Sequence, residues 1–202
     1  HKRIFDGDAG PNTGGMGAYT PVPQIPEEAV QQAISQVLKP TAKGMVAEKR
    51  PFQGILYAGL IQTATGPKVI EFNARFGDPE TQVVLARLES PLSEIISSLL
   101  VKEQPTIAWN ELASVGVVVA AEGYPNQYKT NLPLPEMSGE TIYYAGVTRS
   151  EQALVSAGGR IFLAEATAST LEEARKKVYQ TLDNYSFPGM YYRKDIGVKG
   201  LI

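Results

Sequence analysis

Apolar and polar side chains alternate over residues 68–75, and this pattern predicts a β-strand. In a strand, side chains two positions apart point to the same face. The polar residues are therefore predicted to share one face, within about 14 Å along the strand: Glu71, Asn73 and Arg75. The residues between them are predicted to point to a core on the other face: Ile70, Phe72 and Ala74.

Helical spacing of apolar residues predicts helices over residues 26–49, 91–101 and 170–184. Pro40 is expected to end or kink the first of these helices. Thr170 begins the last helix with a capping-box sequence. A further apolar helix follows residue 78, and its expected N-cap and first position are Asp78 and Pro79.

Other apolar runs predict strands over residues 54–63, 114–121, 141–147 and 160–167. The turn at 64–67 joins the first of these to the strand at 68–75 as an antiparallel hairpin. Residues 122–139 are predicted to be irregular, and residues 5–21 contain too much glycine and proline for a helix or strand interior. The predicted fold class is therefore α+β, with antiparallel sheets and helices.

Composition excludes several classes of protein. The chain has 202 residues, is 43% hydrophobic and 20% charged, and has a net charge of −2, which argues against a general nucleic-acid binder or a cationic membrane surface. It has no cysteine, so disulfides and thiolate metal sites are excluded and a cytoplasmic location is expected. No apolar run approaches the roughly 18 residues that a membrane span requires.

Two features of the first residues bear on function. His1 is the only histidine, which argues against catalysis by a histidine base or triad. The chain enters a dense glycine-rich motif within a few residues of His1, so we expect it to be part of a longer protein.

The polar face of the strand at 68–75 suits a magnesium-bound phosphate. Magnesium takes one or two hard oxygen ligands from protein and the rest from water and phosphate. Glu71 and Asn73 supply such oxygens, and Arg75 can hold phosphate or carboxylate oxygens in bidentate fashion. The alternative is an edge strand whose polar face simply meets solvent.

Residues 5–21 form a candidate substrate loop. The segment lacks the Gly-Lys-Ser/Thr ending of a P-loop, and no strand precedes it as in a dinucleotide fingerprint. Glycines such as Gly14 and Gly15 let the backbone approach a ligand closely. Four side chains of the loop can hydrogen-bond to that ligand: Asp6, Asp8, Asn12 and Thr13. The alternative is a flexible linker or surface loop.

The run Glu-Phe-Asn-Ala-Arg-Phe-Gly-Asp-Pro-Glu-Thr-Gln at 71–82 resembles the signature of the phosphoribosylamine–glycine ligase family, whose members are ATP-grasp enzymes of purine biosynthesis. Residues 6–19 resemble the substrate-facing loop of the same family. The resemblance covers essentially the whole chain, but only the C-terminal half of the family. It implies the C-terminal part of an ATP-grasp domain over residues 1–104 and a small C-terminal domain of strands and helices over 105–202.

The resemblance also implies a reaction, in which glycine is joined to 5-phosphoribosylamine while ATP becomes ADP and phosphate. Its cofactor would be Mg²⁺ or Mn²⁺ held by Glu71 and Asn73, with Arg75 neutralising the transferring phosphoryl group. Its partners would be small molecules and the missing N-terminal part of its own chain, without nucleic acid or membrane. The fragment alone is expected to be inactive, because ATP-grasp enzymes hold the nucleotide between two lobes.

Two smaller segments gain a possible role from the resemblance. A Gly-Gly-Arg turn like that at Gly159 and Arg160 faces the substrate in the family, although a simple tight turn is the alternative. The segment 192–197 resembles one near the C-terminus of many ATP-grasp enzymes, where Arg193 would contact substrate phosphate. An ion pair between Arg193 and Asp195 is the alternative. For the chain as a whole, the alternatives are another ATP-grasp ligase or carboxylase, or a non-catalytic module with the same fold.

Overall fold

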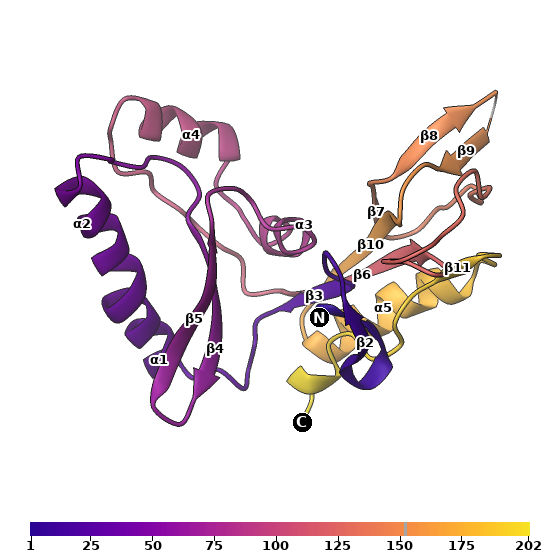
Figure 1. The fold of residues 1–202 in the computed structure, drawn as a ribbon, viewed down its shortest axis with the longest axis horizontal. Coiled ribbons are helices and arrows are strands. Elements are labelled where there is room, and N and C mark those ends of the chain that lie inside the picture. The colour runs from indigo at the N-terminus through magenta and orange to yellow at the C-terminus, as the bar shows by residue number, and fades with distance from the viewer. Residues whose placement is uncertain (152) are drawn as a thin grey trace. The chain divides into compact units, whose positions relative to one another are not determined.

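Figure 1 shows a computed structural model that describes residues 1–151 and 153–202. The chain forms two compact units and passes from one to the other more than once. Unit 1 contains His1–Pro21, Asp78–Glu89 and Trp109–Ile202, and unit 2 contains Val22–Gly77 and Ser90–Ala108. The N-terminal segment therefore belongs to the same compact unit as the C-terminal half.

Unit 1 is organised around a five-stranded antiparallel sheet. Its central strand is β6 (Ala113–Ala121), every residue of which is buried. One edge of β6 pairs with β10 (Arg160–Ala168), and β10 pairs in turn with β7 (Thr141–Tyr144). The other edge of β6 pairs with β3 (Gly17–Thr20) and β11 (Met190–Tyr191).

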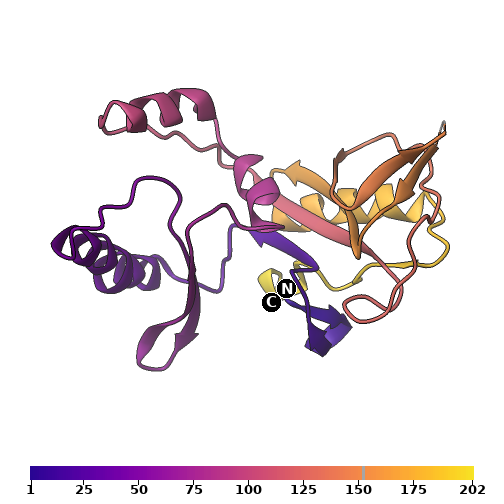
Figure 2. The ribbon, with the colours of Figure 1, turned by 45° about the horizontal axis from the view of Figure 1, so that its top comes forward.

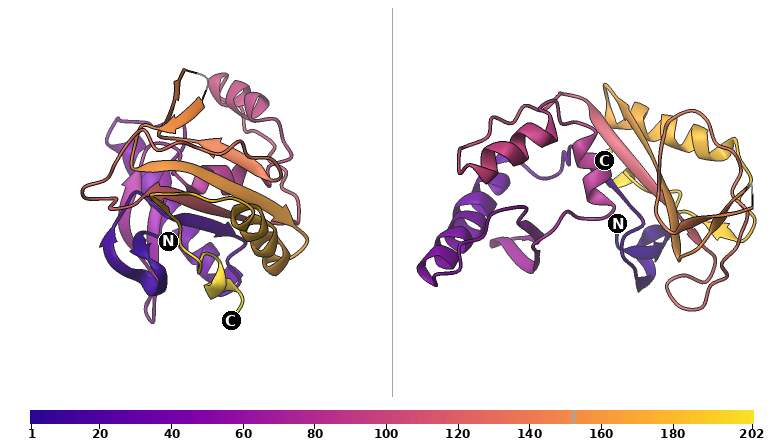
Figure 3. Two further views of the ribbon diagram at one scale, coloured as in Figure 1. Left: turned by 90° about the vertical axis from the view of Figure 1, so that its right-hand side faces the viewer. Right: turned by 90° about the horizontal axis from the view of Figure 1, so that it is seen from above.

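The core of unit 1 lies between this sheet and α5 (Leu171–Asp183), which runs along one face of it (Figure 2 and Figure 3). Alternate residues of β6 and β10, such as Val117 and Phe162, point into this core. The helix begins as expected, because the Thr170 hydroxyl accepts a hydrogen bond of 3.2 Å from the Glu173 amide.

The opposite face of the sheet is covered by the short helix α3 (Glu80–Leu85). Gly116 allows this close packing: a Cβ atom there would lie 2.6 Å from a methyl carbon of Val83, which is buried. Unit 1 also contains a pair formed by β8 (Val147–Ser150) and β9 (Ala153–Ser156). At its N-terminus, β1 (Arg3–Phe5) pairs with β2 (Ala9–Asn12) across the turn η1 (Asp6–Asp8), and η3 (Val198–Gly200) lies near the C-terminus.

Unit 2 contains the predicted hairpin, formed by β4 (Tyr57–Thr63) and β5 (Gly66–Asn73). The predicted helix at 26–49 runs through α1 (Glu27–Ala33), the π-helical turn η2 (Ile34–Leu38) and α2 (Lys39–Ala47). The irregularity expected at Pro40 thus takes the form of a π turn immediately before it. The last helix of the unit is α4 (Leu92–Leu100). Among the described residues, no helix has the length and apolarity that crossing a membrane requires.

Three sequence predictions are wrong in detail. Ile70 and Phe72 do not reach a core in this chain, because they are 64% and 42% exposed. Asp78 is not the N-cap of α3: Pro79 occupies that position, and the Asp78 carboxylate pairs with Arg160 instead. Residues 5–21 do contain short strands, since Gly17 lets β3 lie close to β6, where an added Cβ would come within 2.6 Å of the Gly116 carbonyl oxygen.

A buried carboxylate on the α3 side of the sheet gives a pH-dependent prediction. Glu165 is 4% exposed and accepts a hydrogen bond of 2.7 Å from Ser114, and burial raises its pKa. Two neighbouring side chains interact with it electrostatically: the Glu140 carboxylate, which also raises the pKa of Glu165, and the Tyr143 phenol. A raised folded-state pKa means that the unfolded chain ionises first, so stability is lost as pH rises above about 4.

We therefore expect Glu165→Gln to increase the free energy of unfolding at pH 7, with the gain vanishing below about pH 4. Urea unfolding at both pH values measures this difference. Glu122→Gln, which changes an exposed carboxylate of the same unit, is the control and should show no such dependence. Parallel pH profiles for the wild type and Glu165→Gln would contradict the prediction.

Candidate functional site

Glu71 and Asn73 lie on β5 in unit 2, opposite Gly59 and Tyr57 of β4. The pairing skips Ile70, so a bulge there precedes the two polar residues. Beyond the bulge, Glu71 and Asn73 are two positions apart in regular extended chain, and their side chains share a face about 7 Å apart along the strand.

Gly59 gives the Glu71 side chain room on this face. A Cβ atom at position 59 would lie 3.1 Å from Cγ of Glu71, so any larger residue would crowd the carboxylate. No group of three or more His, Cys, Asp or Glu side chains suited to a metal is found within residues 1–151 and 153–202. One carboxylate and one amide oxygen fit a magnesium ion that takes its remaining ligands from phosphate and water, but do not form an all-protein cage.

Arg75 lies beyond the end of β5, in a bend. Strand alternation therefore does not place it on the face of Glu71 and Asn73, as the sequence pattern predicted. Its side chain is exposed, and Nη1 donates a hydrogen bond of 2.8 Å to the carbonyl of Phe76. The guanidinium of this exposed side chain thus folds back onto its own turn.

The glycine-rich loop of unit 1 is fastened through its backbone. The Thr13 hydroxyl donates to the Lys2 carbonyl at 2.8 Å and accepts from the Gly15 amide at 2.9 Å. The Gly14 amide donates to the hydroxyl of Tyr124 at 3.1 Å. These loop amides are therefore already used inside the protein, whereas the side chain of Asn12 is exposed.

Arg160 connects this loop to the turn before α3. Its Nη1 donates to the carbonyls of Gly14 and Asp78, at 3.2 and 3.0 Å, and Nη2 lies 3.1 Å from the Asp78 carboxylate. The guanidinium lies against the backbone of Gly14, where a Cβ would be only 3.0 Å from Cζ. Gly159 lets the ring of Tyr124 pack against the same turn. The Gly159–Arg160 turn is thus part of the structure that shapes the loop.

Gly15 provides a direct test of this arrangement. It has φ +124°, a conformation that favours glycine, and an added Cβ would collide with the ring of Pro79. We expect Gly15→Ala to lower the free energy of unfolding by about 1–3 kcal/mol. Chemical denaturation measures the change, and Gly44→Ala in α2, where a Cβ meets nothing within 4 Å, is the matched control. Equal stability of the two variants would contradict the described loop.

Arg193 is completely buried in unit 1 and pairs with two carboxylates. Its Nε lies 2.7 Å from Asp195, and Nη1 lies 3.0 Å from Asp8. Burial alone would raise the pKa of Asp195, but hydrogen bonds from Arg193 and the Gly7 amide lower it well below the ordinary range. A hydrogen bond from Lys199 is the largest cause that lowers the pKa of Asp8. Both carboxylates are therefore charged at neutral pH.

The predicted site residues thus fall into two groups. Glu71, Asn73 and Arg75 belong to unit 2, while the loop and the two arginines that contact it belong to unit 1. Sequence reasoning missed two residues that contact these groups, Asp78 and Tyr124, whereas the ion pair of Arg193 with Asp195 is the alternative that the sequence left open. The available signals were the position of Asp78 within the 71–82 motif and the Gly-Tyr-Pro run at 123–125.

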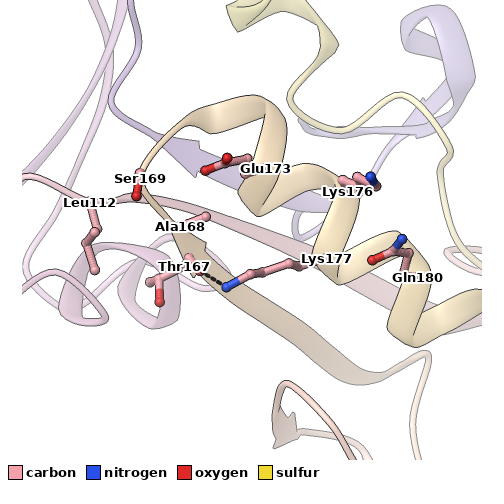
Figure 4. A pocket seen from close by; sticks show the side chains of 8 residues that line it. All are labelled: Leu112, Thr167, Ala168, Ser169, Glu173, Lys176, Lys177 and Gln180. Carbon is pink, nitrogen blue, oxygen red and sulfur yellow. Dashed lines mark hydrogen bonds between the residues drawn. The ribbon is translucent and has the colours of Figure 1, made fainter.

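A separate groove of about 630 Å³ lies beside the first turns of α5 (Figure 4). The figure shows Lys177 reaching back to β10, where its amine donates a hydrogen bond of 3.1 Å to the Thr167 carbonyl. The groove is lined by none of the predicted site residues, so it is not part of the candidate site.

Comparison with known proteins identifies the family. Residues 1–81 match the family model for the ATP-grasp (A) domain of phosphoribosylglycinamide synthetase, and residues 114–199 match the model for its C domain. The chain belongs to the phosphoribosylamine–glycine ligase family. It is 53% identical to a ligase of this name from Halalkalibacterium halodurans and 52% identical to one from Lactococcus lactis, over the whole of this chain. The chain spans about half the length of these curated relatives.

Solved structures agree with this family. The crystal structure of the phosphoribosylamine–glycine ligase from Thermotoga maritima superposes with a TM-score of 0.86 at 36% identity, over 96% of this chain and 49% of that one. A biotin carboxylase domain from Hydrogenobacter thermophilus has a TM-score of 0.62 at 16% identity, over 88% of this chain and 40% of that one. The second likeness shows a shared fold. The expected α+β fold of the ATP-grasp type is thereby confirmed.

Proposed function

We propose that this chain supplies the C-terminal half of a phosphoribosylamine–glycine ligase, which joins glycine to 5-phosphoribosylamine with conversion of ATP to ADP and phosphate. The observation that carries the proposal is the Glu71–Asn73 pair on β5, in a chain about half identical to such ligases along its whole length. Its expected location is the cytoplasm. The chain has no cysteine and so forms no disulfide, as is usual for cytoplasmic proteins.

The chemistry has two steps. An oxygen of the glycine carboxylate attacks the γ-phosphorus of ATP, and the bond to ADP breaks. The sugar amine nitrogen then attacks the carbonyl carbon of the acyl phosphate, and phosphate leaves. Neither step needs a protein nucleophile, so the protein contributes positioning and charge neutralisation.

Glu71 and Asn73 would hold Mg²⁺ or Mn²⁺ through their side-chain oxygens. When bound, such an ion neutralises phosphate charge and orients the phosphoryl group. Arg75, whose side chain is exposed, would hold the transferring phosphoryl or the acyl phosphate.

The loop that contains Asp6, Asp8, Asn12 and Thr13 would face the substrate, with the backbone at Gly14 and Gly15 shaped by the Gly159–Arg160 turn. Asn12 is exposed and is the side chain of this set best placed to donate and accept hydrogen bonds with a ligand. The direct contact of Arg193 with phosphate, predicted from the sequence, would require it to give up part of its ion pairing.

We further propose that the chain works as part of a longer protein. Residues 1–104 would complete an ATP-grasp domain, residues 105–202 would form the family's C-terminal domain, and the preceding half would supply the second nucleotide-binding lobe. On its own the chain should show no turnover.

Product formation by the longer protein tests the proposed reaction. Glycine labelled with ¹⁸O in its carboxylate is supplied with ATP and 5-phosphoribosylamine, and the products are analysed by mass spectrometry. The proposed route predicts glycinamide ribonucleotide and transfer of one ¹⁸O to phosphate. Unlabelled phosphate would contradict the acyl-phosphate route, and absence of the amide product would contradict the proposed ligase activity.

A further inference from the structure

Arg193 uses each nitrogen of its guanidinium inside the protein. Nε and Nη2 each donate to a different oxygen of Asp195 at 2.7 Å, which is a bidentate pair. Nη1 donates to the Arg3 carbonyl and to Asp8, both at 3.0 Å. Because the side chain is fully buried, a substrate cannot reach it in this arrangement.

Residues 193–195 hold the Asp6–Asp8 turn through backbone and side-chain hydrogen bonds. The Gly7 amide donates to Asp195 at 2.9 Å, so one carboxylate serves both Arg193 and the turn. The Lys194 amide donates to Asp6 at 2.8 Å. These partners lie about 190 residues apart in the sequence, yet each residue of the turn is bonded to 193–195.

Helix α5 fixes residues 193–196 from the other side. The Tyr179 hydroxyl donates to the Arg193 carbonyl at 2.7 Å and accepts from the Ile196 amide at 3.1 Å. Arg175 donates to the carbonyls of Lys194 and Ile196. Since α5 packs on the core of unit 1, the segment is a rigid support and not a mobile tail.

We propose that Arg193 is a positioning residue, which together with Asp195 fixes the Asp6–Asp8 turn of the substrate loop on the C-terminal domain. We call the four residues that make these contacts the Arg193 cluster: Arg193, Asp195, Asp8 and Asp6. The loop lies in the region that matches the A-domain model, and Arg193 and Asp195 lie in the region that matches the C-domain model. The cluster therefore makes the geometry of the loop depend on residues of the C domain. Its consequence for substrate binding rests on the proposed function.

Amide hydrogen exchange in the 202-residue chain tests the structural part without any need for catalysis. Asp195→Ala should speed exchange of the Gly7 amide by about tenfold, because its acceptor is lost, while the Val117 amide in β6 stays protected. Asp183→Ala is the matched control, since Asp183 is an exposed carboxylate that pairs with Lys194 but not with the turn. Unchanged Gly7 exchange, or equal loss of protection at Gly7 and Val117, would overturn the proposal.

Kinetics of the longer enzyme test the consequence for function. Asp195→Ala and Arg193→Lys should each raise the KM for glycine or 5-phosphoribosylamine about tenfold and leave the KM for ATP within twofold, with partial rescue in Asp195→Glu. If only Arg193→Lys raises a KM while Gly7 exchange is normal in both variants, Arg193 contacts substrate directly and the proposal fails. If the wild-type enzyme makes no amide product, the proposed function fails, whereas the exchange result stands by itself.

Discussion

Replacing Glu71 with glutamine in the longer ligase is expected to lower kcat by about 100-fold or more. The substitution keeps the size of the side chain but removes the only carboxylate of the Glu71–Asn73 pair, and with it most of the attraction for a divalent ion. Charge stabilisation by a bound metal contributes several kcal/mol to such a transition state, and about 2.7 kcal/mol corresponds to 100-fold. Steady-state ADP release measures the effect.

The control for this experiment is Glu94→Gln, which changes an exposed carboxylate on α4 of the same unit. It should leave kcat within twofold. The Glu71→Gln defect should be partly relieved at high magnesium or manganese concentration, because the variant site binds metal more weakly but retains Asn73. A Glu71→Gln enzyme with normal kcat at ordinary magnesium concentration would show that Glu71 does not bind the metal.

Replacing Phe162 with alanine is expected to cost about 3–5 kcal/mol of unfolding free energy. Phe162 is 1% exposed on β10, and its ring lies 5.6 Å from that of Phe187 in the core beneath α5. Domains of this size are stable by only about 5–15 kcal/mol, so the variant should unfold at much lower urea concentration. Urea titration followed by circular dichroism measures this loss.

The same substitution on β5 is the matched control. Phe72 is 42% exposed in the 202-residue chain, so Phe72→Ala should cost less than about 1 kcal/mol there. In the longer protein, where we propose that further chain completes the ATP-grasp domain, the cost should rise. A large loss from Phe72→Ala in the 202-residue chain would show that the exposed face of β5 is already packed.

Local pattern was sufficient to predict several elements. The strand around Glu71, the hairpin turn before it and the N-cap at Thr170 each depend on residues close in sequence, and each is found. The strand at 114–121 was predicted to be too apolar for a solvent-exposed face, and β6 is buried throughout. Resemblance in the 71–82 motif then gave the family, which the comparisons show.

Other features depend on residues distant in sequence, and no local pattern contains them. The bulge at Ile70 changes which side chains share a face of β5, and the exposure of Phe72 depends on what else packs there. Arg193 was predicted to meet substrate or, as the alternative, to pair with Asp195. The pair with Asp195 is found, but the burial of Arg193 and its bonds to Asp8 and Arg3 arise only when the two ends of the chain meet. Arg160 and Asp78 pair for the same reason.

We propose that this chain carries the metal and substrate elements of a glycine ligase. ADP release from the longer protein, with glycine and 5-phosphoribosylamine each omitted in turn, tests this assignment. We expect release that requires both substrates and collapses in Glu71→Gln. Release that is indifferent to glycine would contradict this assignment and would mean that the loop from Asp6 to Gly17 recognises a different acid.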